Sequence, residues 1–169
     1  IMPPNTAVPR ACRLAAAAAF FDRLAEWVIG TAVVRTHVLA LAGANLCAGV
    51  GFLLLGAVAL GMALPETAAL HALTVGGIGG VILGMITRVA LGHTGRPLHA
   101  ARLIQIAYLL LNISALFRSF GPLDASSIAL AYTGSGLLWI AAFGLFVWHY
   151  APILVQPRAD QPGGLGKRA

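Results

Sequence analysis

The sequence predicts an all-α protein: a polytopic transmembrane bundle of about four spans, preceded by an N-terminal interfacial helix. The composition supports this, since 59% of the 169 residues are hydrophobic, only 9% are charged and the mean hydropathy is +0.88. Soluble domains carry about 25% charged residues. The chain also contains four long stretches without Asp, Glu, Lys or Arg. Such stretches are typical of helices that cross a bilayer core of about 30 Å.

The N-terminal segment, residues 1–36, is predicted not to cross the membrane. Its apolar run at residues 14–21 is interrupted by Asp22, Arg23 and Glu26 before a second apolar run begins. These charges would lie near the middle of the bilayer if the segment crossed it, which is costly. An interfacial helix is therefore favoured over a fifth span. A signal peptide is disfavoured, because charge follows the apolar run and no convincing cleavage pattern is present.

The membrane domain is predicted at residues 37–152. Its third span is short, but Arg102 and Arg118 bracket it and can extend their side chains toward the interfaces. The spans are expected at about residues 38–64, 68–87, 103–117 and 128–148. The polar segment at 153–169, rich in Pro and Gly, is expected to form a disordered cytoplasmic tail.

The positive charges predict the orientation. With both termini in the cytoplasm, Arg118 is the one basic residue outside and ten lie inside: Arg10, Arg13, Arg23, Arg35, Arg88, Arg96, Arg102, Arg158, Lys167 and Arg168. Such an excess is expected of the cytoplasmic side. The bilayer is thus the expected partner. Nucleic acid is not, because no basic face with interleaved aromatic residues is present.

Small residues recur every four positions along the second span, at Ala72, Gly76, Gly80 and Gly84. In lipid, this spacing allows the backbones of two helices to approach closely. Helix packing is therefore the first interpretation. The alternative is that the missing side chains leave room for a flat cofactor beside the helix.

The segment from Arg88 to Pro97 places two arginines and a histidine in an expected turn at the end of this apolar span. Ionisable residues at such a position point to function. His93, between Arg88 and Arg96, is well placed for an anionic group such as a propionate or a phosphate. In the alternative, His93 is an ordinary turn residue whose neighbouring glycines supply positive φ.

His71 lies near the outer end of the same span, where a ligand and a hydrated polar group are both open interpretations. Since 22 residues separate it from His93, about 33 Å along a straight helix, the two cannot bind one metal ion. No histidine pair has the spacing of three or four that closed metal sites use.

The remaining candidate ligands are more simply interpreted as packing or interfacial residues. Met62 and Met85 would suit a soft metal such as copper, but methionine more often fills space. Cys47 is expected to act as a small apolar residue. The other histidines are expected at the level of the lipid head groups: His37, His99 and His149.

No pattern of catalytic residues is visible. The sequence contains no nucleophile with a neighbouring base, no phosphate-binding loop and no carboxylate pair. None of the five acidic residues falls within an expected span, which argues against proton-coupled transport through a buried carboxylate. Enzymatic activity is left open by the sequence.

The runs from His71 to Gly80 and from Met85 to Leu98 resemble the signature near the C-terminus of the NnrS family. A looser resemblance covers residues 139–154. This is a family of bacterial inner-membrane proteins associated with haem and copper and with nitric oxide metabolism and denitrification. The resemblance implies that the chain binds haem, with copper as a second candidate. It implies roles for His71 or His93 as a metal ligand, and for Arg88 and Arg96 as partners of the haem propionates.

The resemblance also sets expectations for the whole protein. Family members have about a dozen spans, so the chain resembles the last third to two-fifths of one. Expected partners are the missing N-terminal spans of a longer chain or further copies of this chain. The expected location is the bacterial inner membrane. The alternative function is a non-enzymatic helical membrane module, or part of a transporter, without a metal site.

Overall fold

The computed structural model describes residues 7–27, 36–121 and 125–160, and this part of the chain is helical without strands, as predicted. It begins with α1 (Ala7–Trp27) and α2 (Thr36–Ala59). The next three elements join into one continuous helix: α3 (Glu66–His71), the π-helix η2 (Ala72–Ile78) and α4 (Gly79–His93). Then follow α5 (Arg102–Phe120), the short 3-10 helix η4 (Ala125–Ser127) and α6 (Ile128–Leu154).

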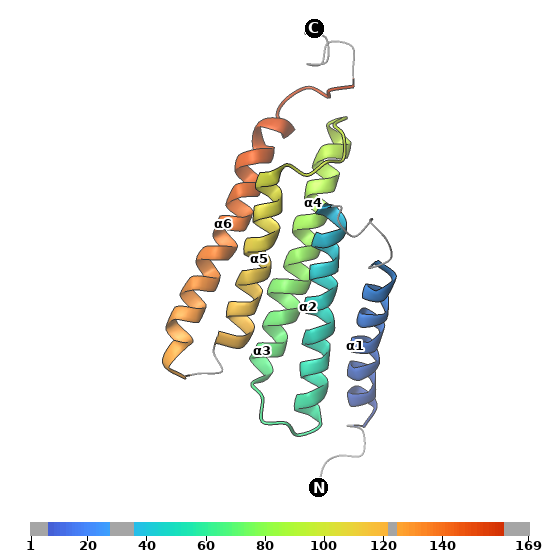
Figure 1. Cartoon of the computed structure of the whole chain (residues 1–169), viewed down its shortest axis with the longest axis vertical. Coiled ribbons are helices and arrows are strands. Elements are labelled where there is room, and N and C mark those ends of the chain that lie inside the picture. The colour runs from blue at the N-terminus through green and yellow to red at the C-terminus, as the bar shows by residue number, and fades with distance from the viewer. Residues whose placement is uncertain (1–6, 28–35, 122–124, 161–169) are drawn as a thin grey trace.

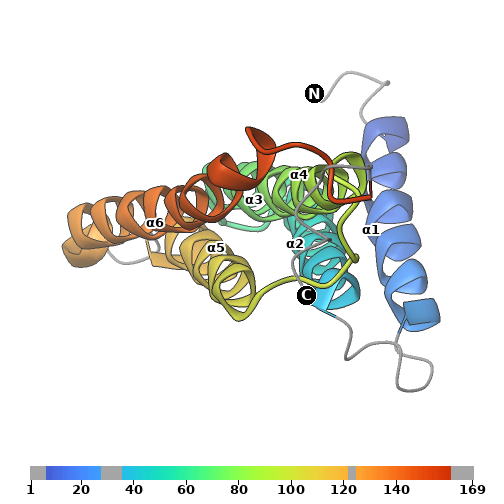
Figure 2. The ribbon, with the colours of Figure 1, turned by 90° about the horizontal axis from the view of Figure 1, so that it is seen from above.

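Four helices are long and apolar enough to cross a membrane, which confirms the predicted number. They are Val38–Ala59, Glu66–His93, Arg102–Phe120 and Ile128–Leu154. All four run along the long axis of the molecule (Figure 1), with α1 at one side of the bundle and α6 at the other (Figure 2). The second of these helices carries His71 near its start and His93 at its end. We therefore call the two ends of the bundle the His71 end and the His93 end.

The second span extends further than predicted. The sequence led us to expect a turn from Arg88, whereas α4 remains helical up to His93. Its last residues are held in the helix because Ala90 and Leu91 are buried in the core. The helix ends where the Thr94 hydroxyl donates to the Ala90 carbonyl at 2.7 Å, and Gly95 then adopts a φ of +66°. Arg88 and His93 are therefore helical residues, not turn residues.

Within this span, the π-helix η2 was not predicted from the sequence. It begins directly after His71, and Thr74 bonds back to the Leu70 carbonyl at 2.8 Å. Its glycines face α2: a Cβ atom added to Gly76 would lie 2.6 Å from the Cys47 sulfur. One turn later, a Cβ atom on Gly80 would lie 2.8 Å from the Cβ of Ala44.

Helix α1 packs antiparallel against α2. Leu14 lies against Gly56 and Phe21 against Gly49, while the rings of Phe20 and Phe52 stack with centroids 5.6 Å apart. Helix α1 contains the first apolar run and the charged residues that follow it, whereas residues 28–35, which hold the second run, lie outside the described part of the chain. Helix α1 is not among the helices apolar enough to span a membrane. Its interfacial position remains a prediction.

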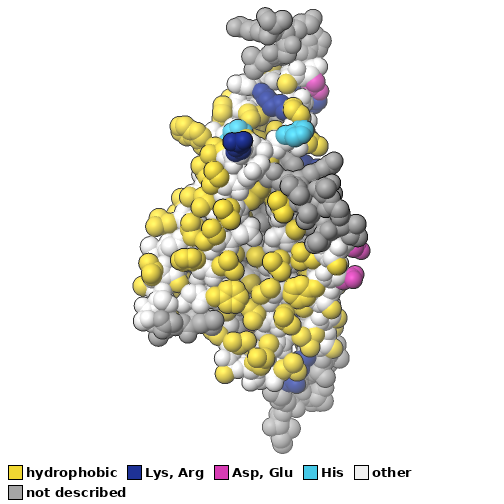
Figure 3. Space-filling model, in the orientation of Figure 1, with side chains coloured by type: hydrophobic (Ala, Val, Ile, Leu, Met, Phe, Trp, Pro, Cys, Tyr) yellow, Lys and Arg dark blue, Asp and Glu magenta, His cyan; other side chains and the backbone are white. Residues whose placement is uncertain are grey.

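The charges of α1 lie beside the middle of α2. Asp22, Arg23 and Glu26 follow directly after the contact of Phe21 with Gly49, and Arg23 pairs with Glu26 at 3.0 Å. Figure 3 shows acidic side chains at the right edge about halfway along the molecule, whereas histidine side chains lie toward its upper end and basic side chains toward both ends. Helix α1 therefore starts at the His71 end and runs toward the middle of the bundle.

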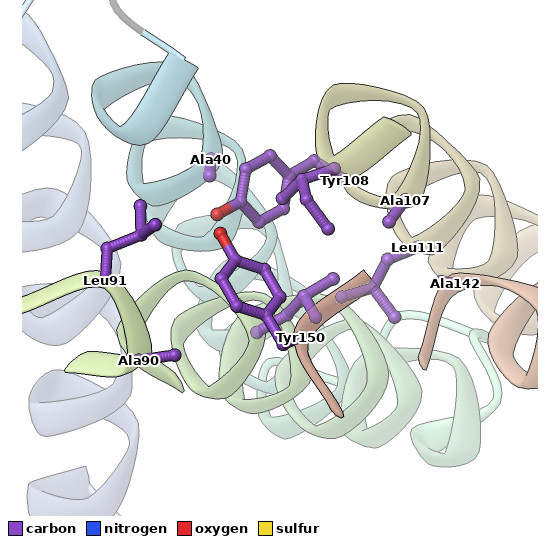
Figure 4. Packing of buried hydrophobic residues seen from close by; sticks show 10 residues of the cluster. Ala40, Ala90, Leu91, Ala107, Tyr108, Leu111, Ala142 and Tyr150 are labelled. Atoms are coloured by element: carbon purple, nitrogen blue, oxygen red, sulfur yellow. The ribbon is translucent and has the colours of Figure 1, made fainter. Parts of the chain in front are cut away.

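A cluster of buried hydrophobic residues lies toward the His93 end, among α2, α4, α5 and α6 (Figure 4). Deeper in the bundle, α5 and α6 are joined by the Ser114 hydroxyl, which donates to the Ser135 carbonyl at 2.8 Å. Helix α6 extends to Leu154, and residues 156–160 bond to the loop after α4. The disordered tail predicted from residue 153 therefore does not include 153–160. Residues 161–169 lie outside the described part.

Candidate functional site

A groove at the His93 end contains two of the predicted site residues. Its walls include Leu41 from α2 and Met85, Arg88, Val89 and His93 from α4. Its volume is about 470 Å³, which falls within the range of about 300–1,000 Å³ typical of small-molecule sites. The groove therefore unites an imidazole, a guanidinium and a thioether between apolar walls.

The helical spacing of α4 explains how these side chains come together. Four lining residues of α4 follow each other at intervals of three, one and three positions: Met85, Arg88, Val89 and Gly92. Such intervals place them on one face of the helix. Nothing lies within 4 Å of a Cβ atom built on Gly92, which leaves the floor of the groove open. Arg88 is exposed and makes no ion pair within the part of the chain that the structure describes.

Arg96, the second predicted arginine, does not line this groove. Its Nη2 donates to Gln156 Oε1 at 2.8 Å, and its Nη1 is buried with no hydrogen-bond partner in the described part of the chain. The same segment is fixed by a bond from the Ala159 amide to the Thr94 carbonyl at 2.9 Å, and the Asp160 carboxylate lies against Gly95. The structure thus ties Arg96 to the segment after α6 and leaves Arg88 with His93.

His71 belongs to a different cluster, at the opposite end of the same long helix. The rings of His71 and Tyr132 pack edge to face, with their centroids 5.9 Å apart. The guanidinium carbon of Arg118 lies 4.2 Å from the centroid of the Tyr132 ring. The Nδ1 atom of His71 is buried and has no hydrogen-bond partner among the residues that the structure describes. Since His71 and His93 lie at opposite ends of one continuous helix, they do not meet in one site.

The other predicted candidates do not gather into a metal centre. His99 is exposed in the loop before α5, and His149 contacts the ring of Tyr150 at 5.0 Å. Met62 is exposed between α2 and α3, and Cys47 is half-buried beside Gly76. The side chain of His37 lies outside the described residues. No group of three or more His, Cys, Asp or Glu able to hold a metal occurs within the described ranges.

Two buried tyrosines were not singled out from the sequence. Tyr150 on α6 is fully buried, and Tyr108 on α5 is 6% exposed. Their hydroxyl groups point toward each other (Figure 4), and within the described ranges neither hydroxyl has a hydrogen-bond partner. An interfacial belt and a buried contact have the same sequence signal, a tyrosine near a span end, so the sequence did not separate them.

A sequence model of a protein family, described as NnrS protein, matches residues 1–158. No curated protein and no solved structure matches the chain.

Proposed function

The chain belongs to the NnrS family, and from this premise we propose that it is a membrane protein that binds haem and takes part in nitric oxide metabolism or in protection against nitrosative stress. The observation that carries the proposal is the groove at the His93 end. It places the imidazole of His93 and the guanidinium of Arg88, which makes no ion pair among the described residues, beside apolar side chains of α2 and α4.

The residues of this groove fit the chemistry of haem. A neutral imidazole is a common axial ligand of haem iron, and His93 is exposed enough to reach a ligand. The Arg88 guanidinium would neutralise a propionate through charge-assisted hydrogen bonds. Bound haem would supply an iron centre for the binding of nitric oxide. Arg96 would contact the second propionate only after releasing Gln156.

Copper is the second candidate, because the thioether of Met85 and the imidazole of His93 line the same groove. Both donors suit a soft or borderline metal. Since two donors do not complete a closed site, a copper ion here would take further ligands from elsewhere. Haem needs fewer ligands from the protein, because its porphyrin already supplies four nitrogen ligands to the iron.

The test is the absorbance of the purified protein after reconstitution with haem. We expect a Soret band that is lost in His93→Ala and weakened in Arg88→Gln. The matched control is His99→Ala, at the same end of the bundle but outside the groove. A band that persists in His93→Ala and disappears in His71→Ala would assign haem to the His71 end instead.

A second candidate function is a helical packing module without a metal site. The close approach of Gly76 and Gly80 to α2 favours it, because this spacing serves helix association by itself. In that case the reconstituted protein is colourless, and His71→Ala and His93→Ala leave its assembly unchanged.

A further inference from the structure

Beyond the groove at the His93 end, the surface between α2 and α4 is hollowed a second time, nearer the middle of the bundle. A second, almost wholly apolar groove of about 380 Å³ follows it, with Phe20 from α1 and Phe52 from α2 among its walls. On the other side it is bounded by Ile78 and Ile82. The linings of the two grooves follow each other along α2, where Leu41 lines the first and Ala44 and Asn45 line the second.

Helical spacing shows that the two grooves share one seam. On α2, four lining residues follow each other at intervals of four, three and four positions: Leu41, Asn45, Ala48 and Phe52. Such intervals keep side chains on one face of a helix.

The facing helix repeats the same intervals with Ile78, Ile82, Met85 and Val89. These four side chains are 46% to 58% exposed. We call the combined surface the α2–α4 groove. It is apolar along most of its length and basic at one end.

We propose that the α2–α4 groove binds a phospholipid with an anionic head group, whose phosphate contacts Arg88 and whose acyl chain follows the groove to Ile78. This inference goes beyond the proposed function, since it names a different occupant. The lipid and haem would both use Arg88 and would therefore exclude each other.

The charge at the end of the groove suits a phosphate. Arg88 is exposed and has no carboxylate partner within the described residues. Its guanidinium matches phosphate oxygens in a bidentate geometry. Basic pockets between transmembrane helices are a known type of site for anionic head groups.

The length of the groove suits an acyl chain. Ile78 lies ten residues from Arg88, about 15 Å along the helix at 1.5 Å per residue. This is half of a hydrocarbon core of about 30 Å, and thus the depth that one leaflet provides. Along this length the polar amide of Asn45 is already bonded to the Leu41 carbonyl at 2.9 Å, so the wall offers hydrocarbon contacts.

The experiment measures lipid retained by the full chain in detergent, by native mass spectrometry. Phosphatidylglycerol and phosphatidylcholine of equal chain length are offered together. We expect preferential retention of one phosphatidylglycerol, and a loss of about tenfold in its affinity in Arg88→Gln, the scale of one charge-assisted contact. The control is Arg102→Gln, an exposed arginine at the same end that does not line the groove.

A second pair of variants tests the groove without changing charge. Gly92→Leu places a side chain in the groove, where a Cβ atom meets nothing within 4 Å, so folding is expected to be preserved. Gly144→Leu is the control, since Gly144 on α6 also faces open space. We expect Gly92→Leu to reduce lipid retention and Gly144→Leu to leave it unchanged.

Three outcomes would overturn the proposal. These are equal retention of the two lipids, retention unchanged in both Arg88→Gln and Gly92→Leu, and displacement of the lipid by glycerol phosphate at equal concentration, which would show that a free phosphate suffices. His93→Ala separates this inference from the proposed function. It should abolish the Soret band while phosphatidylglycerol is still retained.

Discussion

At the scale of single residues, the glycines of the second span differ in what they contact. Gly76 and Gly80 lie so close to α2 that an added Cβ would approach Cys47 or Ala44 to less than 3 Å. A Cβ on Gly84 would meet its nearest neighbour, Leu41, at 3.7 Å, an ordinary contact distance. The regular spacing of four in the sequence therefore hides two tight positions and one looser one.

We expect Gly76→Ala to destabilise the protein by about 1–3 kcal/mol, the usual cost of adding a methyl group to a well-packed contact. The reason is the overlap with the side chain of Cys47 and the Cβ of Ala115. Gly136→Ala should have almost no effect, because nothing lies within 4 Å of its Cβ position. Thermal unfolding in detergent measures both. Equal melting temperatures for the two variants would contradict the packing seen here.

Asp160 gives a prediction about pH. The Arg158 guanidinium donates to both of its carboxylate oxygens, at 3.0 and 2.8 Å, and lowers the pKa of Asp160 below its ordinary value of 3.8. A lowered pKa means that the folded contact favours the ionised form. The contact is therefore complete above the ordinary carboxyl pKa and is lost as the pH falls through the lowered value.

The carboxyl carbon shift of Asp160 in an NMR titration should show this lowered midpoint. In Arg158→Gln the midpoint should return toward 3.8, since the hydrogen bonds of the guanidinium are the largest cause of the shift. An unchanged midpoint in that variant would show that Arg158 does not hold the carboxylate in solution.

The sequence alone could single out candidate site residues, but not all of their neighbours in the fold. His71 and His93 were expected at opposite ends of one span because helix length follows from residue count. In contrast, Arg88 and Leu41 line one groove because of the way α2 packs against α4. The burial of Tyr150 likewise depends on its neighbours in the core around α5, which no local pattern records.

At the scale of elements, hydropathy predicted the four spans because each must supply an apolar surface of membrane length. It did not predict where α4 ends, since Val89, Ala90 and Leu91 continue a helix as readily as they line a turn. The π-helix was equally hidden. Within it, Gly76 and Gly77 lie against α2, a tertiary contact that no local sequence pattern records.

The contact between α5 and α6 gives a prediction at this scale. Ser114 and Ser135 are both buried, and the Ser114 hydroxyl lies 2.8 Å from the Ser135 carbonyl and 3.1 Å from its hydroxyl. Removing one partner of a buried hydrogen bond costs about 0.5–1.5 kcal/mol, and interhelical bonds in membranes average near the lower limit, about 0.6 kcal/mol. Ser114→Ala should therefore lower stability by this amount.

A double-mutant cycle with Ser135→Ala isolates the bond between the two hydroxyls. We expect the effects of the two substitutions to be non-additive, because each removes the same contact. Additive effects would show that α5 and α6 are held by their apolar contacts alone.

At the scale of the whole molecule, the direction of α1 changes the distribution of charge. All basic residues before the first span were expected on the cytoplasmic side. In the structure, the Arg13 guanidinium donates to the Leu55 carbonyl at 3.3 Å, near the end of α2 at the His71 end. Arg10 lies one turn earlier in α1, so both residues lie on the same side of the bundle as Arg118.

The His93 end still carries Arg88, Arg96, Arg102 and Arg158 among the described residues. The positive-inside rule counts charges close to the ends of spans. It therefore continues to favour a cytoplasmic His93 end, with a smaller excess than the sequence suggested. Orientation is thus a prediction that depends on α1 and needs a direct test.

Cys12 provides that test, because it is exposed near the start of α1. In a Cys47→Ala background, a membrane-impermeant maleimide should label Cys12 only from the outer side of intact cells. A cysteine introduced by His99→Cys, in the loop at the His93 end, should be labelled only after the inner face is opened. The reason is that antiparallel packing of α1 on α2 places the two residues at opposite ends of the bundle. Labelling of both positions from one side would show that α1 leaves α2 and lies where the sequence first placed it, at the same membrane surface as the loop.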